Sequence, residues 1–261
     1  MAGWAGRLGK AAAVTLIAGT VGGAAVIAGE AVAARIRRYA QPDLNLAMRA
    51  VVGPVSAPPV RLVLMGDSGA LGVGVDRVAD TVGGRLAELL SAEAGGRRVE
   101  LSCVAVTGSR SADLATQVAR ALLGGPPDVA VILVGASDVT GLRRLGDAAG
   151  HLGRAVQRLR DAGVAVVVGT CPDLGAARAF APPLRQLLGY AARRATRAQV
   201  AAVRAAGGTA VDLGRSTGPV FRADAGTLCR DGFHPSADGY RVWAHALYPA
   251  VAEAAGAARP S

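Results

Sequence analysis

The feature of this sequence that most constrains its fold is a regular alternation of short, Val-rich apolar runs with longer segments of helical spacing. The apolar runs are residues 61–66, 99–106, 128–134, 164–170 and 209–213. The helical segments are residues 79–93, 111–123, 142–162, 183–206 and 237–255. Short apolar runs are typical of strands buried on both faces, and strands that alternate with helices form parallel sheets. The pattern predicts an α/β fold, a three-layer α/β/α sandwich around a five-stranded parallel sheet.

The connections between these strands also restrict their order. Right-handed crossovers place successive helices on the two faces of a sheet. We expect the flavodoxin-like order 2-1-3-4-5, with the strands numbered along the chain. In such a sheet the loops that follow the strands meet at one edge, where ligands bind. Functional residues are therefore expected in those loops.

The amino-terminal region differs from the rest of the chain. Residues 11–29 contain no charged residue, and basic residues flank them on both sides. We interpret residues 1–39 as a membrane anchor or signal segment, which places the protein at the cell membrane or exported to the cell envelope. An uncleaved anchor, a signal cleaved near the small residues 31–33 and a soluble amphipathic helix remain alternatives. Residues 40–59 contain four prolines and are predicted to form a linker, and residues 60–256 are predicted to form the folded domain.

The chain is basic, with a net charge of +10 over 261 residues, and Lys10 is its only lysine. Such arginine richness is typical of GC-biased coding, and it also suits anionic lipid surfaces. The arginines are scattered, and no aromatic-interleaved basic patch accompanies them. We therefore expect no nucleic-acid partner.

Three cysteines, Cys103, Cys171 and Cys229, are too far apart in sequence for a close metal-ligand spacing, so we expect no metal site. Cys103 lies in an apolar run and is predicted to be a buried core residue. If the domain is exported, Cys171 and Cys229 can form a disulfide, and two free thiols are the alternative.

Short polar motifs follow the predicted strands. Gly66-Asp67-Ser68 follows the first, and Asp231-Gly232-Phe233-His234 follows the fifth, before the last helix. A serine becomes a nucleophile when a base takes its proton and a carboxylate orients that base. His234 is the candidate base, and Asp231 lies near enough in sequence to orient it. Asp67 is expected to support the nucleophile loop by hydrogen bonding.

With these motifs the chain resembles the SGNH/GDSL hydrolase family of serine esterases and lipases, over about residues 60–255. The matching blocks are Gly66-Asp67-Ser68, Gly108 and the pair Asp231 and His234. The resemblance implies that the backbone N–H groups of Ser68 and Gly108 hold the oxyanion. The third block reads Gly135-Ala136-Ser137-Asp138 where the family usually has Gly-x-Asn-Asp. Ser137 then stands in for an oxyanion-stabilising Asn, and Asp138 is expected to position loops.

The sequence therefore predicts a serine esterase that hydrolyses carboxylic ester bonds through an acyl-enzyme, with no cofactor. Its substrate is a small-molecule, lipid or polysaccharide ester, and its membrane contact is through the amino-terminal segment. A non-catalytic carbohydrate- or partner-binding domain on the same scaffold, and an acyltransferase variant, remain alternatives. Nucleotide binding is not predicted, because the glycines at 66, 69, 72 and 74 match neither the dinucleotide fingerprint nor a P-loop.

Overall fold

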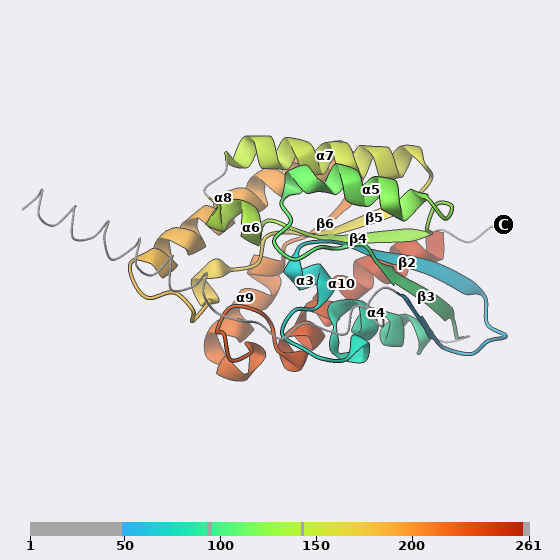
Figure 1. The fold of residues 1–261 in the computed structure, drawn as a ribbon, viewed down its shortest axis with the longest axis horizontal. Coiled ribbons are helices and arrows are strands. Elements are labelled where there is room, and N and C mark those ends of the chain that lie inside the picture. The colour runs from blue at the N-terminus through green and yellow to red at the C-terminus, as the bar shows by residue number, and fades with distance from the viewer. Residues whose placement is uncertain (1–48, 93–95, 142–143, 258–261) are drawn as a thin grey trace, which may run out of the picture.

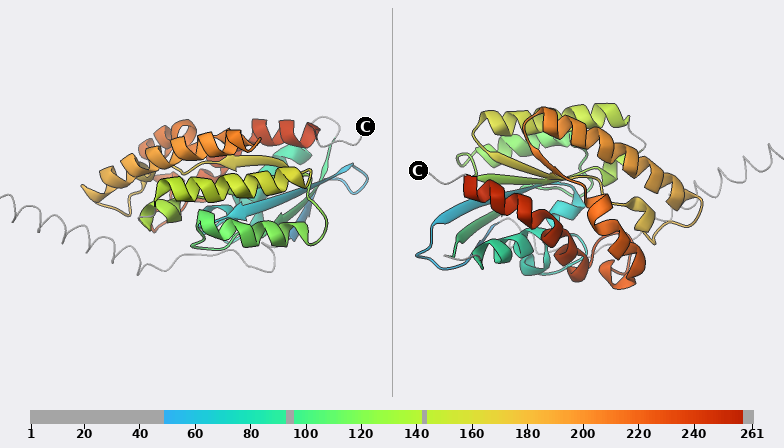
Figure 2. Two further views of the ribbon diagram at one scale, coloured as in Figure 1. Left: turned by 90° about the horizontal axis from the view of Figure 1, so that it is seen from above. Right: turned by 180° about the vertical axis from the view of Figure 1, so that it is seen from behind.

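The computed structural model describes residues 49–92, 96–141 and 144–257. In these ranges a six-stranded sheet lies between two layers of helices (Figures 1 and 2). The strands are β1 Arg49–Val52, β2 Pro59–Gly66, β3 Arg98–Cys103, β4 Val129–Leu133, β5 Ala165–Gly169 and β6 Thr209–Val211. The α-helices are α3 Ser68–Leu71, α4 Val82–Ser91, α5 Leu114–Leu122, α6 Ala136–Thr140, α7 Leu145–Asp161, α8 Leu184–Ala205, α9 Leu213–Ala223 and α10 Ala237–Ala257. The 3₁₀ helices are η1 Val78–Asp80, η2 Ser111–Asp113, η3 Leu174–Ala176 and η4 Ala225–Thr227.

The sheet order is β1-β3-β2-β4-β5-β6. β1 runs antiparallel to β3, and all other neighbours are parallel. The predicted five-stranded, all-parallel sheet is therefore corrected to a mixed sheet of six strands. The added strand has only four residues, all exposed or half-buried, so it lacks the apolar run that marks the buried strands. β1 lies within residues 40–59, the predicted linker.

The burial of β2 explains its apolar sequence. Val63 and Met65 pack into a core with α5 and α7, whereas Leu62 and Leu64 pack into a core with α4 and α10. Because side chains alternate across a strand, a strand covered on both faces needs apolar residues throughout. Figure 1 shows α5 and α7 on one side of the sheet and α4 and α10 on the other. β2 therefore lies inside the sheet, and its carboxyl end is fixed in the middle of the domain.

The predicted helices are present, and their ends differ from prediction for local reasons. Residues 111–113 form η2, so α5 begins at Leu114. The predicted strand 209–213 ends at Val211, because Asp212 caps a helix, α9, that the sequence did not indicate. The Asp212 carboxylate accepts a hydrogen bond from Arg215 N at 2.9 Å. Such a cap satisfies one of the free N–H groups of the first helical turn.

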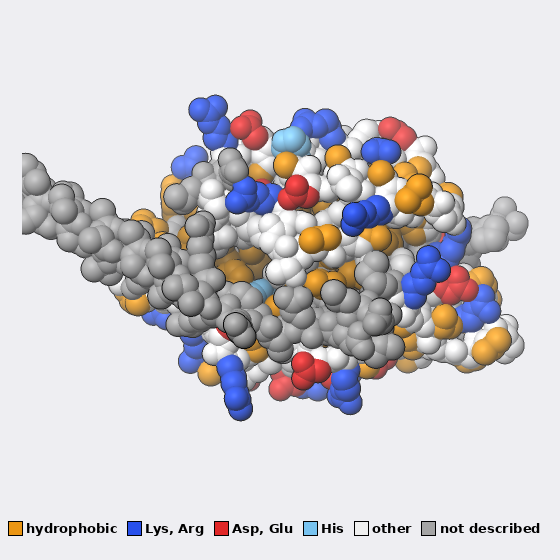
Figure 3. All heavy atoms as spheres, viewed as in Figure 1, with side chains coloured by type: hydrophobic (Ala, Val, Ile, Leu, Met, Phe, Trp, Pro, Cys, Tyr) orange, Lys and Arg blue, Asp and Glu red, His pale blue; other side chains and the backbone are white. Residues whose placement is uncertain are grey.

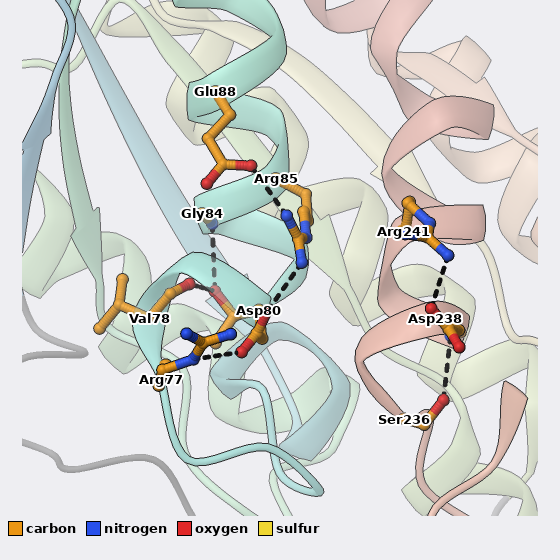
Figure 4. Close-up of polar contacts among 11 residues, drawn as sticks. Arg77, Val78, Asp80, Gly84, Arg85, Glu88, Ser236, Asp238 and Arg241 are labelled. Atoms are coloured by element: carbon orange, nitrogen blue, oxygen red, sulfur yellow. Dashed lines mark hydrogen bonds and ion pairs between the residues drawn. The ribbon is translucent and has the colours of Figure 1, made fainter. Parts of the chain in front are cut away.

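The segment between α3 and α4 is held by a group of charged side chains (Figure 4). Asp80 accepts from Arg77 Nε at 2.7 Å and from Arg85 at 2.7 Å. Arg85 also donates to Glu88 at 3.0 Å. The Thr81 hydroxyl caps α4 by accepting from Gly84 N at 3.1 Å. These hydrogen bonds stabilise the segment that connects α3, which begins with the predicted nucleophile Ser68, to α4.

The predicted membrane anchor or signal segment, residues 1–39, lies outside the described residues. Within the described ranges, no helix combines the length and the apolar character that crossing a bilayer requires.

Candidate active site

Ser68 is the first residue of α3 and follows the sharp turn at the end of β2. Gly66 has a φ of 127°, a conformation that L side chains rarely adopt. A Cβ at this position would lie 1.8 Å from the carbonyl oxygen of Leu133. Only glycine lets the chain turn this close to β4. The Asp67 side chain then caps α3 by accepting from Gly69 N at 3.0 Å, which confirms its predicted support of the nucleophile loop.

Burial gives Asp67 an unusual proton affinity. It raises the pKa of Asp67 to about 6, against the opposing effects of the Gly69 hydrogen bond and the nearby His234. Burial disfavours the charged form of a carboxyl group when no cation is in contact with it. Asp67 is thus a structural cap, and its ionised form at neutral pH costs stability.

A buried glutamine holds the turn from the α5 side. Gln117 Oε1 accepts from Gly66 N at 2.7 Å, and Gln117 Nε2 donates to Gly66 O at 2.9 Å. Nε2 also lies 3.1 Å from the Ser109 hydroxyl. Sequence reasoning missed Gln117. The available signal was a polar residue between Leu114 and Val118 on the buried face of a helix.

His234 and Asp231 reach Ser68 from the loop between η4 and α10. His234 Nε2 lies 3.0 Å from Ser68 Oγ, and His234 Nδ1 lies 2.6 Å from Asp231 Oδ2. The other Asp231 oxygen accepts from the backbone N–H groups of Phe233 at 2.7 Å and of His234 at 2.9 Å. The structure therefore brings together the three predicted residues Ser68, Asp231 and His234, although they are up to 166 residues apart.

The hydrogen bonds at Asp231 fix its charge. Burial alone would raise the pKa of Asp231, but the hydrogen bonds from His234, Cys229 and the backbone outweigh it and hold this pKa well below the usual range. Asp231 is consequently an anion at any working pH. An anion next to Nδ1 keeps the proton on that nitrogen and leaves Nε2 free to accept one from Ser68.

Gly108 lies in the loop after β3 and Ser137 lies in α6, which follows β4; β3 and β4 are the two strands that flank β2. Gly108 is exposed with a φ of 78°, and Ser137 is half-buried in the first turn of α6. In the described ranges neither residue makes a hydrogen bond to Ser68 or His234, so their oxyanion roles stay predictions. Asp138 accepts from Ser111 N at 3.1 Å and from the Ser111 hydroxyl at 2.7 Å. This bond ties α6 to the β3 loop and confirms that Asp138 positions loops.

The cysteines are free thiols, so the predicted alternative of a Cys171–Cys229 disulfide is wrong and the free-thiol alternative holds. Cys171 is fully buried after β5. The Cys229 thiol donates to Asp231 Oδ1 at 2.9 Å. Burial and this bond raise the pKa of Cys229 to about 11, so the thiol stays protonated and remains a donor to the carboxylate.

A small apolar cavity opens beside Ser68 and His234, with a volume of about 50 Å³. It is lined in part by Leu133, Leu174, Leu213, Phe221, Phe233 and Trp243. By this measure one water needs roughly 10–15 Å³, so the cavity holds a group of a few atoms.

Within the described ranges, no three His, Cys, Asp or Glu side chains are placed to bind a metal ion.

Known proteins are similar to this chain in sequence and in fold. GDSL-like esterase Rv1075c of Mycobacterium tuberculosis is 44% identical over 197 residues, which are 75% of this chain and 62% of that protein. The match thus spans less than two thirds of that relative. The crystal structure of TesA superposes with a TM-score of 0.61 at 20% identity, covering 74% of this chain and 99% of TesA. A catalytic mutant of Axe2, an acetylxylan esterase from Geobacillus stearothermophilus, gives 0.57 at 18% identity, covering 76% of this chain and 94% of Axe2.

These structural likenesses establish the fold, and a family model establishes the family. The model of the GDSL-like lipase/acylhydrolase family matches residues 64–242, from the end of β2 into α10. That stretch contains Ser68, Asp231 and His234 in the order and geometry described above. The chain belongs to the GDSL-like lipase/acylhydrolase family.

Proposed function

We propose that the protein is a serine esterase that hydrolyses carboxylic esters through an acyl-enzyme on Ser68. The observation that carries this proposal is the chain of contacts from Ser68 Oγ to His234 Nε2 at 3.0 Å and from His234 Nδ1 to Asp231 at 2.6 Å. Family membership and the 44% identical esterase support the same reaction class.

The chemistry follows from the positions of these atoms. Ser68 Oγ attacks the ester carbonyl carbon while His234 Nε2 takes its proton. Asp231 stabilises the imidazolium that results. When the tetrahedral intermediate collapses, the C–O bond to the alcohol breaks and His234 gives the alcohol its proton. Water then attacks the acyl-enzyme with the same histidine as base, which releases the carboxylic acid and restores Ser68.

The oxyanion of the intermediate is assigned to the N–H groups of Ser68 and Gly108, with Ser137 as a third donor. Each such donor is worth on the order of 10²–10³ in rate. The Ser137 side chain is shorter than the Asn usual in the family, so we expect a weaker third contact. A Ser137→Ala variant that keeps the full kcat would remove Ser137 from this assignment.

The size of the cavity favours short acyl groups. A space of about 50 Å³ beside Ser68 fits an acetyl or similarly small group better than a long chain. One of the structural neighbours, Axe2, is named as an acetylxylan esterase. We therefore expect acetyl esters to be hydrolysed faster than octanoyl esters.

Labelling by a fluorophosphonate probe tests the nucleophile. Wild-type protein should be labelled, whereas Ser68→Ala should lose labelling and about 10³-fold or more of its esterase activity. Ser216→Ala, which changes an exposed serine on α9, is the matched control and should behave as wild type. Absence of labelling in the wild type would instead favour the non-catalytic binding domain, for which the replacement of Asn by Ser137 is the supporting observation.

We further propose that the protein acts at the cell envelope, held by residues 1–39. The support is the charge-free stretch 11–29 with its basic flanks. The full chain should stay with membranes after an alkaline carbonate wash. Complete release into the supernatant would contradict the anchor.

A further inference from the structure

Two neighbouring helices, α8 and α9, each carry more than one arginine and no acidic residue. α8 contains five arginines and α9 contains two, and neither contains Asp or Glu. α7, which packs on α8, has three arginines but also Asp147 and Asp161. On the face in Figure 3, acidic side chains likewise lie among the basic ones. A general bias toward arginine does not explain this difference, because it would affect all helices alike.

Three of the five arginines of α8 lie along one row of its surface. Arg185, Arg193 and Arg197 are eight and four residues apart, so they follow a single i±4n row, which winds gradually around the helix. Like charges at this spacing weaken a helix. Within the ranges that the structure describes, the guanidinium groups of these three arginines, and that of Arg215 on α9, make no hydrogen bond or ion pair. This row therefore presents unneutralised positive charge.

These side chains line two adjoining hollows between η3, α8 and α9, which share Arg193 and Arg222. We call the pair the arginine groove. Its arginines are Arg178, Arg185, Arg193, Arg197, Arg215 and Arg222. Its two acidic residues are already engaged, since Asp173 pairs with Arg222 and Asp212 caps α9.

The arginine groove adjoins the site at Ser68. Pro172 and Asp173 line both the groove and the apolar cavity beside Ser68, and Ala176 lines both as well. In the binding mode inferred here, the acyl group of an ester enters the cavity and its alcohol part extends past these shared residues into the groove. The cavity is apolar and small, so a charged group on the substrate has to lie on the alcohol side.

We propose that the arginine groove binds a phosphate group on the alcohol part of the substrate, so that the preferred substrates are short-chain esters of phosphorylated alcohols. Guanidinium groups bind phosphate through paired, charge-assisted hydrogen bonds, and several of them match its two negative charges. This inference rests on the proposed esterase function, and it names the substrate class of that site.

A matched pair of substrates tests the proposal on the full chain. 1-Acetylglycerol 3-phosphate and 1-acetylglycerol share the same ester bond and differ in the phosphate. Wild type should prefer the phosphorylated ester in kcat/KM by about tenfold. In the double variant Arg193→Gln, Arg197→Gln, the ratio of the two kcat/KM values should fall about fivefold. Arg204→Gln, on the same helix but outside the groove, should keep the wild-type ratio.

The outcomes separate the two proposals. No preference in the wild type, or an unchanged ratio in a folded double variant, overturns the phosphate site while the esterase function stands. Failure to hydrolyse either ester, together with absent fluorophosphonate labelling of Ser68, overturns the esterase function itself. Phosphate can also be presented by a lipid headgroup. If the double variant loses binding to phosphatidylcholine vesicles that contain phosphatidate but keeps the wild-type ratio, the groove binds lipid and the substrate class is wrong.

Discussion

At the scale of single residues, Asp67 and Asp231 lie in the same site near Ser68, but their pKa values are shifted in opposite directions. Asp231 receives several hydrogen bonds and stays ionised, whereas Asp67 receives one and is destabilised as an anion. Burial raises the pKa of Asp67 more than its hydrogen bonding lowers it, whereas the hydrogen bonds to the less deeply buried Asp231 outweigh burial. One carboxylate serves the histidine, and the other serves the backbone of α3.

This difference predicts a pH-dependent stability. The pKa of Asp67 is raised from 3.8 to about 6 on folding, so the folded state binds more protons between pH 4 and pH 6. Stability contributed by protonated Asp67 is present below pH 4 and lost as the pH rises through 6. Asp67→Asn, which keeps the cap, should therefore stabilise the protein at pH 7.5 by on the order of 1–3 kcal/mol and change little at pH 4.

Urea unfolding of both proteins at the two pH values measures this effect. Destabilisation of equal size at both pH values would show that the cap, and not the charge, sets the contribution of Asp67.

A second prediction concerns two buried threonines. In the described ranges the hydroxyl of Thr170 has no hydrogen-bond partner, whereas that of Thr196 donates to Cys171 O at 3.1 Å. An unsatisfied buried hydroxyl costs free energy that a methyl group does not. Thr170→Val should stabilise the protein by about 1 kcal/mol, and Thr196→Val should destabilise it by about 1 kcal/mol. Thermal unfolding of the two variants tests this, and equal shifts of the same sign would refute it.

At the scale of elements, α5 is coupled to the nucleophile turn by one side chain. Gln117 satisfies both backbone polar groups of Gly66. Gln117→Met should leave the buried N–H of Gly66 unpaired, while Gly66 O keeps its bond from Val106 N at 3.2 Å, which costs about 1–3 kcal/mol of stability. Activity at a temperature where the variant remains folded should also fall, because the position of Ser68 depends on this turn. Gln157→Met, on the exposed side of α7, is the control and should change neither quantity. A Gln117 variant with normal stability would contradict the coupling.

The elements that the sequence predicted are those with a strong local signal. β4, β5 and residues 62–66 of β2 are apolar throughout because both of their faces are covered. β1 and α9 were missed for the opposite reason. β1 is a short, exposed edge strand, and α9 contains Pro219 and two glycines, which lower its apparent helical propensity.

The same distinction applies to the site. Ser68, Asp231 and His234 are recognisable because their chemistry demands those residue types. The contacts of Gln117, Cys229 and Asp67 could not be predicted in detail, because they depend on how separate loops pack at the sheet edge. The arginine groove belongs to this second class, since its residues come together only when η3, α8 and α9 meet.

At the scale of the whole molecule, the sheet separates two cores. Leu86 on α4 lies in one and Leu159 on α7 lies in the other, and both are fully buried. Leu→Ala at either site should cost about 2–5 kcal/mol. Since the two residues share no neighbour across the sheet, the costs should add to within about 0.5 kcal/mol in the double variant.

Denaturant unfolding followed by two probes, tryptophan fluorescence and circular dichroism, checks this additivity. Coincident transitions and additive costs mean that both layers unfold as one cooperative unit. Separate transitions for the two single variants would mean that each layer is stable without the other.

The contact of Gly66 with Leu133 has a consequence for how this protein can be engineered. In a library with every amino acid at position 66, selection for soluble, folded protein should return glycine alone, because any side chain overlaps the backbone of β4. Gly108 has no heavy atom within 4 Å of its Cβ position, so space does not limit it and only its φ of 78° does. Substitution at Gly108 is therefore limited by backbone strain alone, whereas substitution at Gly66 is limited by both strain and overlap with β4.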